Sequence, residues 1–270
     1  MSYLDSISYF YAIELQEQIF LEYIKIYMNV INLHQYIRRV DLRSDKIESF
    51  EDYPYNLPAV KNLSNLVLHP KVTYLVGENG TGKSTILEAI AVAYGFNAEG
   101  GSKNFNFSTH STHSNLHENL TLAKGPKNPQ DSFFLRAESF YNLATNIDEI
   151  GAENSYGGVS LHEQSHGESF FSVIMNRFRG NGLYILDEPE AALSPARQLA
   201  LLSRMHDLIK KSTQFIIATH SPIVMAYPDS SLFELSSAGF NKVDYRETEH
   251  FKVMKSFIDN PKMMLDILLT

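Results

Sequence analysis

The sequence contains no cysteine among its 270 residues. It therefore forms no disulfide, binds no metal through thiolates and uses no cysteine nucleophile, which suits the cytoplasm that we expect as its location. Uninterrupted apolar stretches near the roughly 20 residues of a membrane helix are also missing, so we expect no membrane segment. Net positive charge is absent as well, because the formal net charge is −8. The domain as a whole is thus no electrostatic attractor for nucleic acid, which leaves only a local basic patch for that role.

The composition that remains, 44% hydrophobic and 20% charged, is that of an ordinary globular protein. Its length suffices for one large α/β domain or two small ones. Residues 1–32 differ from the rest, since they are crowded with tyrosine, phenylalanine and isoleucine, and charged residues interrupt them too often for a membrane span or a secretory signal. We interpret them as an N-terminal extension, with Met28 as an alternative start, and expect the main domain over residues 33–270.

The strongest motif runs from Gly77 to Ser84 and has the pattern Gly, any four residues, Gly-Lys-Ser. The apolar run 72–76 before it predicts a buried strand, and residues 86–93 after it predict a helix. A strand, a glycine loop and a helix N-terminus together direct backbone N–H groups and the helix dipole at a polyphosphate. We therefore predict a phosphate-binding loop rather than a chance glycine turn. Its predicted binding residues are Gly77, Glu78, Asn79, Gly80, Thr81, Gly82, Lys83, Ser84 and Thr85.

Within this loop two side chains have separate predicted roles. Lys83 is expected to contact the β- and γ-phosphates, and the hydroxyl of Ser84 is expected to bind Mg²⁺. A second apolar run, residues 183–186, ends in Asp187 and Glu188. Such a strand end is where P-loop proteins hold Mg²⁺, and the adjacent glutamate is placed to orient or deprotonate the attacking water. The alternative is a helix cap, because acids favour first turns.

Two more polar groups lie at element ends. The strand predicted at 215–219 runs into His220, at the carboxyl end where α/β sheets bind ligands. Ser165 and Gly167 stand just before a helix predicted over 170–178, which is another anion-binding arrangement. Residues 191–194 are expected to form a turn before a helix that begins at Pro195.

The remaining segments carry weaker signals. Residues 36–50 are spaced like an exposed-edge strand pair, 104–108 and 132–136 like strands, and 248–269 like a helix interrupted near Pro261. In the turn-rich connection 53–58, a tyrosine either stacks on an adenine ring or simply packs. Three histidines in a polar stretch invite a metal interpretation, but no carboxylate pattern completes a site, so we expect them to be solvated. They are His110, His113 and His117.

Together these motifs resemble the ATP-binding-cassette ATPase superfamily, and most closely its small stand-alone members related to the chromosome-maintenance and recombination-repair ATPases. The resemblance covers about residues 36–270. It implies an α/β P-loop fold with a mostly parallel core sheet flanked by helices, and an antiparallel β subdomain. By this resemblance residues 77–84 are the Walker A loop and residues 183–187 the Walker B strand. Glu188 is then the catalytic base and His220 the switch histidine that contacts the γ-phosphate.

The same resemblance implies that residues 165–169 are the signature motif and residues 191–194 the D-loop. Glu138 stands where the Q-loop glutamine of the family belongs, and it joins Ser84 and Asp187 as an expected Mg²⁺ ligand. About 80 residues without heptads separate Ser84 from Ser165, so the long coiled-coil arms of the chromosome-maintenance relatives are absent.

The resulting hypothesis is an ATP hydrolase with ATP and Mg²⁺ as cofactors. It dimerises around two nucleotides, so that Ser165 and Gly167 of one subunit complete the site of the other. One alternative is an interaction module whose ATP-dependent dimerisation controls a partner, such as a nuclease or DNA, with slow hydrolysis as a timer. Another is a P-loop kinase for a small molecule, which is disfavoured because Glu188 beside Asp187 suits water activation better than transfer to an acceptor.

Overall fold

The computed structural model describes residues 34–103 and 114–269. The predicted N-terminal extension, the strand predicted at 104–108, and His110 and His113 lie outside the described residues. Within residues 34–103 and 114–269, no helix combines the length and the apolar character needed to cross a membrane.

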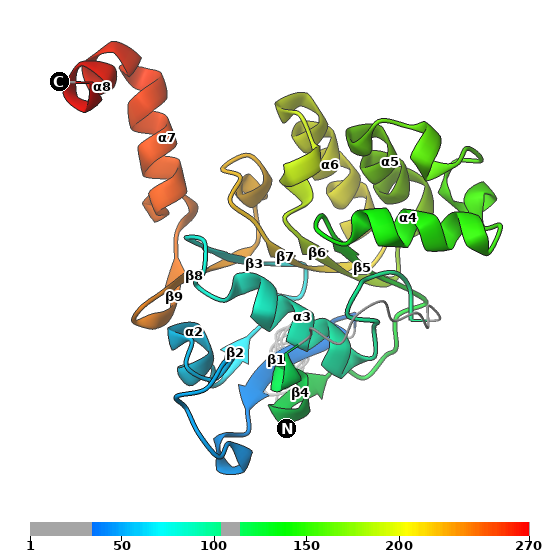
Figure 1. The fold of residues 1–270 in the computed structure, drawn as a ribbon, viewed down its shortest axis with the longest axis horizontal. Helices are drawn as coiled ribbons and strands as arrows, with labels where there is room; N and C mark the ends of the chain where they lie inside the picture. The colour runs from blue at the N-terminus through cyan, green and yellow to red at the C-terminus, as the bar shows by residue number, and fades with distance from the viewer. Residues whose placement is uncertain (1–33, 104–113, 270) are drawn as a thin grey trace, which may run out of the picture. The chain divides into compact units, whose positions relative to one another are not determined.

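A six-stranded sheet forms the centre of the fold, in the order β5-β6-β7-β3-β8-β9 (Figure 1). All neighbours pair in parallel except β9, which is antiparallel to β8. The prediction of a mostly parallel core sheet is confirmed. Its strands are β3 (Val72–Gly77), β5 (Asp131–Arg136), β6 (Gly182–Asp187), β7 (Gln214–Ala218), β8 (Ser231–Ser236) and β9 (Gly239–Val243).

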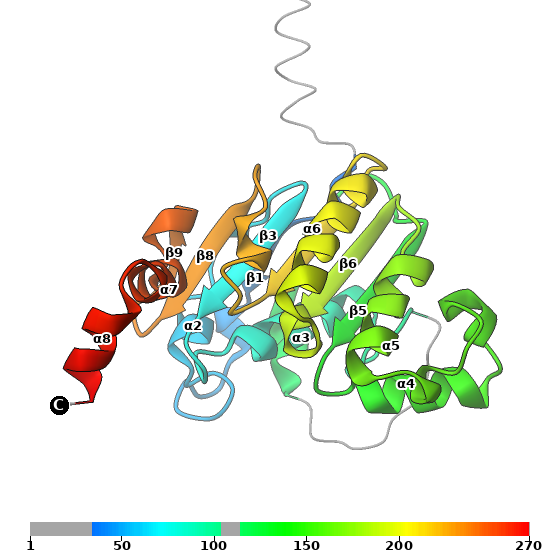
Figure 2. The same ribbon diagram turned by 90° about the horizontal axis from the view of Figure 1, so that it is seen from above.

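Helices cover both faces of this sheet. Side chains alternate between the two faces along each strand, so neighbouring residues of a strand belong to different hydrophobic cores. In β6, Tyr184 and Leu186 belong to the core under one helical layer, whereas Leu183 and Ile185 belong to the core on the opposite face. Both faces are thus buried, which explains why the strand is apolar at every position up to its last residue. The first layer contains α4 (Phe140–Glu149), α5 (His166–Ser172) and α6 (Pro195–Ile209), and the opposite face carries α3 (Lys83–Tyr94) (Figure 2).

The predicted antiparallel subdomain is a three-stranded sheet, β2-β1-β4, which packs on the α3 side. It comprises β1 (Ile37–Leu42), β2 (Leu66–Val67) and β4 (Leu120–Lys124). The expectation of an edge strand pair within residues 36–50 is wrong, because β1 is the central strand and both of its partners come from later in the chain. A short 3-10 turn (Ser44–Lys46) follows β1 in place of the second strand.

Shorter helical segments connect these elements. The helix predicted over 170–178 begins earlier, as α5, and continues as a π-helical turn, Val173–Arg177. The chain also has α2 (Pro58–Lys61) and 3-10 turns at Asn115–Asn119, Glu153–Tyr156, Leu161–Glu163, Pro189–Ala192, Val224–Ala226 and Tyr245–Glu247.

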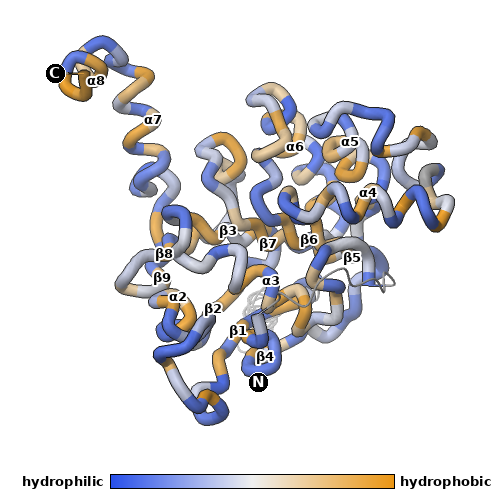
Figure 3. The backbone as a smooth tube through the Cα atoms, viewed as in Figure 1, coloured by the Kyte–Doolittle hydropathy of each residue, from blue (hydrophilic) through white to orange (hydrophobic). Residues whose placement is uncertain are grey.

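Two helices, α7 (Glu249–Asp259) and α8 (Pro261–Leu268), end the described chain and extend away from the sheet (Figure 1). We call them the C-terminal arm. The predicted helical tail with a break near Pro261 is confirmed. Orange, hydrophobic segments alternate with polar ones along the arm (Figure 3), and several large apolar side chains on it, such as Ile258 and Ile267, are exposed.

One buried amide joins the two sheets. Gln214, the first residue of β7, is fully buried, and its Oε1 accepts hydrogen bonds from the backbone N–H groups of Tyr36 and Ile37, both at 2.9 Å. Its Nε2 donates to the carbonyls of Ile37 at 2.8 Å and His69 at 3.0 Å. The side chain thus supplies hydrogen-bond partners to the backbone at the start of β1, beside the amino end of β7.

We predict that Gln214→Ala lowers the free energy of unfolding by about 3 kcal/mol, because it leaves buried backbone N–H groups without an acceptor. Urea unfolding measures this change. Gln164→Ala is the control, since its amide makes only long contacts of 3.4 and 3.5 Å with backbone carbonyls. Equal stability of the two variants would contradict the bridging role.

Candidate active site

The glycine loop lies between the end of β3 and the start of α3, as predicted. At Gly77, with a φ of 134°, an added Cβ would lie 2.5 Å from the backbone oxygen of Leu235 in β8. Gly82, the N-cap of α3, has a φ of 96°. Only glycine adopts such angles without strain, so the loop's path depends on these two residues.

Lys83 is buried across the mouth of this loop. Its ammonium donates to the carbonyl oxygens of Gly77 at 2.9 Å and Glu78 at 2.8 Å. Burial lowers its pKa, and the nearby carboxylates of Glu188 and Asp187 oppose that shift. The positive charge of Lys83 therefore lies at the loop. Its two partners are neutral carbonyl oxygens, which an anionic ligand can replace.

The two strongest candidate Mg²⁺ ligands are in contact. The hydroxyl of Ser84, in the first turn of α3, donates to Oδ1 of Asp187 at 3.0 Å. Asp187 is the last residue of β6, and its burial raises its pKa to about 6, against the lowering effects of Arg136 and Ser84. A hydroxyl and a carboxylate oxygen are the hard donors that Mg²⁺ prefers, so this pair fits the cation.

Glu138, the third predicted Mg²⁺ ligand, borders the same cavity of about 380 Å³ as Ser84 and Asp187. Its carboxylate instead pairs with Arg136, at 3.1 Å, and is largely exposed. Within residues 34–103 and 114–269, no group of three or more histidine, cysteine or acidic side chains is arranged to hold a metal. The Mg²⁺ role of Glu138 therefore stays a prediction.

Glu188 follows β6 in a left-handed conformation, with a φ of 49°. Its Oε1 lies 3.6 Å from Nε2 of His220, which follows β7. Because Asp187 pairs with Ala218, and Ala218 in turn pairs with Leu75 of β3, the sheet register brings these groups beside the glycine loop. Burial and the charge of Lys83 lower the pKa of His220, so its neutral form dominates at pH 7.

Two supporting residues escaped the sequence analysis. Glu190 is half-buried, and its Oε1 accepts from the backbone N–H groups of His220 at 2.6 Å and Ser221 at 3.2 Å. Burial raises the pKa of this carboxyl. The position of Glu190 after Pro189, beside the predicted D-loop, was the available signal, but its partner is 30 residues away in sequence.

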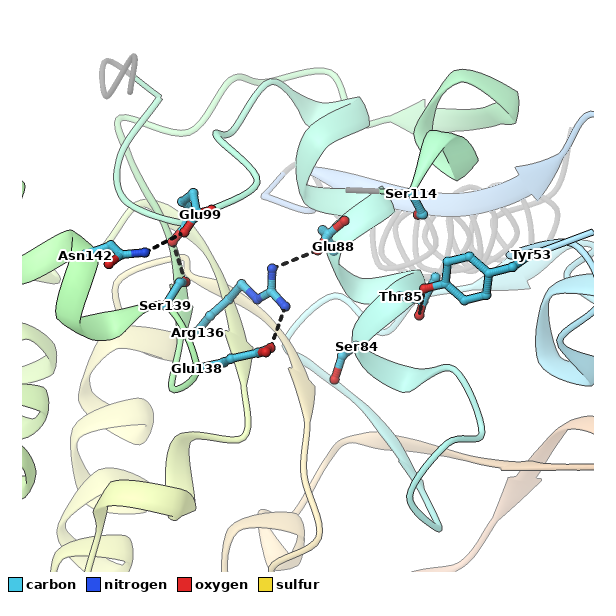
Figure 4. A pocket seen from close by; sticks show the side chains of 10 residues that line it. All are labelled: Tyr53, Ser84, Thr85, Glu88, Glu99, Ser114, Arg136, Glu138, Ser139 and Asn142. Carbon is cyan, nitrogen blue, oxygen red and sulfur yellow. Dashed lines mark hydrogen bonds and ion pairs between the residues drawn. The ribbon is translucent and has the colours of Figure 1, made fainter. Parts of the chain in front are cut away.

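Arg136, the last residue of β5, is the second. Its Nη1 lies 2.7 Å from Glu88 of α3, and its Nε lies 3.6 Å from Asp187. Figure 4 shows its guanidinium between Glu88 and Glu138 in a cavity of about 470 Å³. The arginine thus connects the helix after the glycine loop to the strand that carries Asp187.

The tyrosines of the 53–58 connection differ in their surroundings. Tyr53 is exposed, borders the same cavity as Arg136, and its hydroxyl lies 3.3 Å from Oγ1 of Thr85 (Figure 4). Tyr55 is buried, and its hydroxyl bonds with Asn115 and Asn119. Tyr55 therefore packs in the protein interior. For Tyr53, stacking on an adenine ring stays a prediction.

The predicted signature segment forms the N-terminus of α5. Ser165 is its exposed N-cap, and its hydroxyl donates to Glu168 at 2.6 Å in a capping box. A Cβ on Gly167 would lie 2.5 Å from the carbonyl oxygen of Ala192, so this helix end packs closely on the predicted D-loop. His166 borders the cavity that contains Ser84, Asp187 and Glu188. His117, by contrast, lies in a 3-10 turn with Nδ1 3.2 Å from the carbonyl oxygen of Ser114.

Two family models match the sequence of this chain. Residues 41–173 match a family model described as "AAA domain", and residues 152–226 match one described as "AAA domain, putative AbiEii toxin, Type IV TA system". The two matches run together from the end of β1 to the segment after His220, and so span every predicted site motif. Over these residues the chain is similar to AAA-domain families.

Individual relatives of this chain are distant in sequence. ABC transporter G family member 22 of Arabidopsis thaliana is 26% identical in an alignment of 182 residues that covers 59% of this chain and 24% of the relative. The chain therefore spans about a quarter of that relative's length.

Solved structures with a similar fold include the SMC head domain from Thermotoga maritima, with a TM-score of 0.45, 16% identity and coverage of 77% of this chain and 99% of that one. A nucleotide-free ATP-binding cassette from an ABC transporter has a TM-score of 0.47, 17% identity and coverage of 82% and 95%.

The buried carboxyl of Asp187 yields a prediction about pH. The folded-state pKa of Asp187, about 6, lies above its unfolded value of 3.8, so the folded protein binds more protons between these values. Asp187 therefore lowers the free energy of unfolding as the pH rises through this window, and the loss is complete above about pH 6. We expect Asp187→Asn, without metal or nucleotide, to raise that free energy by about 2 kcal/mol at about pH 7.5, and by less at about pH 4.5.

Urea unfolding at the two pH values tests this expectation. Asp207→Asn, an exposed substitution on α6, is the control and should change little at either pH. A variant at Asp187 that is less stable than the native chain at both pH values would contradict the proposed cost of the buried charge.

Proposed function

We propose that this chain binds ATP with Mg²⁺ and hydrolyses the β–γ phosphoanhydride bond. The observation that carries the proposal is the convergence of Lys83, the Ser84–Asp187 pair, Glu188 and His220 at neighbouring strand ends. No other group of described residues combines a phosphate loop, a hard-donor pair and a base.

Binding begins at Lys83, whose two carbonyl partners are weak compared with phosphate oxygens. The ammonium exchanges them for the β- and γ-phosphates, while backbone N–H groups at the start of α3 receive the same anion. Ser84 and Asp187 would hold Mg²⁺, which when bound supplies positive charge to the phosphates during transfer. Their mutual hydrogen bond opens to do so, and a bound cation lowers the pKa of Asp187, which removes the cost of its buried charge.

Hydrolysis needs a group that activates water. Glu188 adjoins Asp187, its side chain is half-exposed, and its carboxylate faces the ring of His220 at 3.6 Å. We assign it as the general base that accepts a proton from the attacking water. Neutral His220 then donates from Nε2 to a γ-phosphate oxygen and stabilises the negative charge on that oxygen during transfer. Glu190 keeps the backbone of His220 in place for this contact.

We further propose that the complete site forms between two copies of the chain. Ser165 is exposed at the N-terminus of α5, and its capping partner Glu168 is itself exposed. Once the Ser165 hydroxyl leaves Glu168, this hydroxyl and the N–H groups of the helix end suit a phosphate presented by another molecule. The close packing of Gly167 on the predicted D-loop places these two segments side by side. In the dimer, Ser165 and Gly167 of each copy face the nucleotide bound to the other.

A second candidate function is control of a partner protein by ATP-dependent dimerisation. The exposed apolar side chains of the C-terminal arm favour it, because large apolar residues gathered on one projecting element mark interaction surfaces. A separate effector, such as a nuclease, fits this surface better than DNA does, given the net charge of −8.

We predict that Glu188→Gln binds ATP, fails to hydrolyse it and accumulates as a dimer. The substitution keeps the size of the side chain and removes its basicity, and closure persists because hydrolysis no longer ends it. Light scattering with Mg²⁺ and ATP, combined with a count of nucleotide retained per chain, measures both effects.

Glu163→Gln is the matched control, because Glu163 lies in an exposed 3-10 turn outside the proposed site. It should turn over ATP like the native chain. Turnover at the native rate by Glu188→Gln would overturn the base assignment. A variant that retains ATP and stays monomeric would overturn the shared site.

A further inference from the structure

A second histidine contacts the proposed switch residue. Nδ1 of His220 and Nε2 of His250 lie 3.1 Å apart, and the two ring centroids are separated by 5.3 Å. His250 belongs to the first turn of α7, the first helix of the C-terminal arm. The contact therefore joins the arm directly to the site.

The start of α7 is fixed firmly enough to make this contact specific. Thr248, its N-cap, is fully buried, and its hydroxyl accepts from the backbone N–H of Phe251 and donates to the carbonyl oxygen of Tyr245. The hydroxyl of Tyr245 in turn donates to the carbonyl oxygen of Pro222, two residues after His220, at 2.9 Å. These hydrogen bonds connect the start of α7, which carries His250, to the segment that follows His220.

Proton positions follow from the acceptors around the pair. Two neutral imidazoles share a hydrogen bond only when one ring donates and the other accepts. Nε2 of His220 has no hydrogen-bond partner among the described residues, but it lies 3.6 Å from the Glu188 carboxylate, whose negative charge favours a proton on that nitrogen over a lone pair. Nδ1 of His220 is then unprotonated and accepts from the Nε2–H of His250. The buried Nδ1 of His250 has no hydrogen-bond partner among the described residues, which also disfavours a proton there.

We propose that His250 is a positioning residue that fixes His220 in the tautomer with its proton on Nε2, so that the placement of the C-terminal arm sets the readiness of the phosphate site. The proposal rests on the function proposed above, in which His220 donates from Nε2 to the γ-phosphate. In the opposite tautomer Nε2 presents a lone pair to a phosphate oxygen, and the contact becomes repulsive.

The surroundings of His250 make its position dependent on the arm. A cavity of about 540 Å³ runs from His220 and His250 along the arm, where its walls are mostly apolar. Its arm-side walls include Val253, Phe257, Met264 and Leu268. A shift of α7 by about 1 Å would lengthen the histidine contact beyond hydrogen-bond distance and release the tautomer of His220.

The tautomer is measured directly by ¹⁵N NMR of histidine-labelled full-length chain without nucleotide. We expect a protonated Nε2 and an unprotonated Nδ1 on His220, and a mixture of tautomers in His250→Ala. A native His220 with its proton on Nδ1 would overturn the proposal. This readout needs no turnover, so it decides the proposal even if the native chain fails to hydrolyse ATP and the function proposed above falls.

Kinetics provide the second test. His250→Ala should lower kcat about ten- to a hundredfold, as loss of an orienting partner does, with little change in ATP affinity. His250→Gln should restore most of kcat, because its amide N–H also donates. His206→Ala, which removes a histidine of α6 that contacts the Tyr227 hydroxyl instead, is the control and should leave kcat and the His220 tautomer unchanged. An unchanged kcat in His250→Ala would overturn the proposal, and so would failure of His250→Gln to exceed it.

Discussion

The parallel pairing of β6, β7 and β3 is the constraint on which the site depends. Carboxyl ends of parallel strands meet at one edge of a sheet, so the register that aligns Asp187 with Ala218 also brings Glu188 and His220 next to the glycine loop. Burial of both faces between two helical layers makes this register hard to shift, because a slip of one residue would exchange the two cores.

Three ionisable side chains of the site are partly or fully removed from solvent. Lys83 and Asp187 are buried and Glu190 is half-buried, and burial shifts the pKa of each group toward its neutral form. Such groups cost free energy while they remain without a strong partner. A polyphosphate and a divalent cation would relieve the first two costs, whereas Oε1 of Glu190 already accepts from the backbone N–H groups of His220 and Ser221.

Local patterns were sufficient to predict the glycine loop, the strand that ends at Asp187 and the strand before His220, because glycine spacing and apolar runs encode these elements directly. The partners of β1 were mispredicted since strands from distant segments pair with it, and sequence spacing near residue 40 holds no record of them. Arg136, Glu190 and His250 escaped for the same reason.

Those three residues act through contacts that span tens of positions in the chain, from Arg136 to Glu88 and from His250 to His220. Glu138 borders the same cavity as Ser84 and Asp187, and its carboxylate pairs with Arg136, so its role as a metal ligand stays a prediction. The tertiary setting, which a pattern of residue types does not contain, decides such assignments.

The central claim is that two copies of the chain share each nucleotide site, and activity in mixtures tests it most directly. Lys83→Ala removes the cation of the glycine loop, and Ser165→Arg places bulk and charge where the second copy binds, so each variant alone should lose turnover. In a mixed dimer one site carries both defects and the other carries neither. An equal mixture should therefore recover about a quarter of native turnover. A mixture as inactive as its components, at concentrations where mixed dimers form, would contradict the shared site.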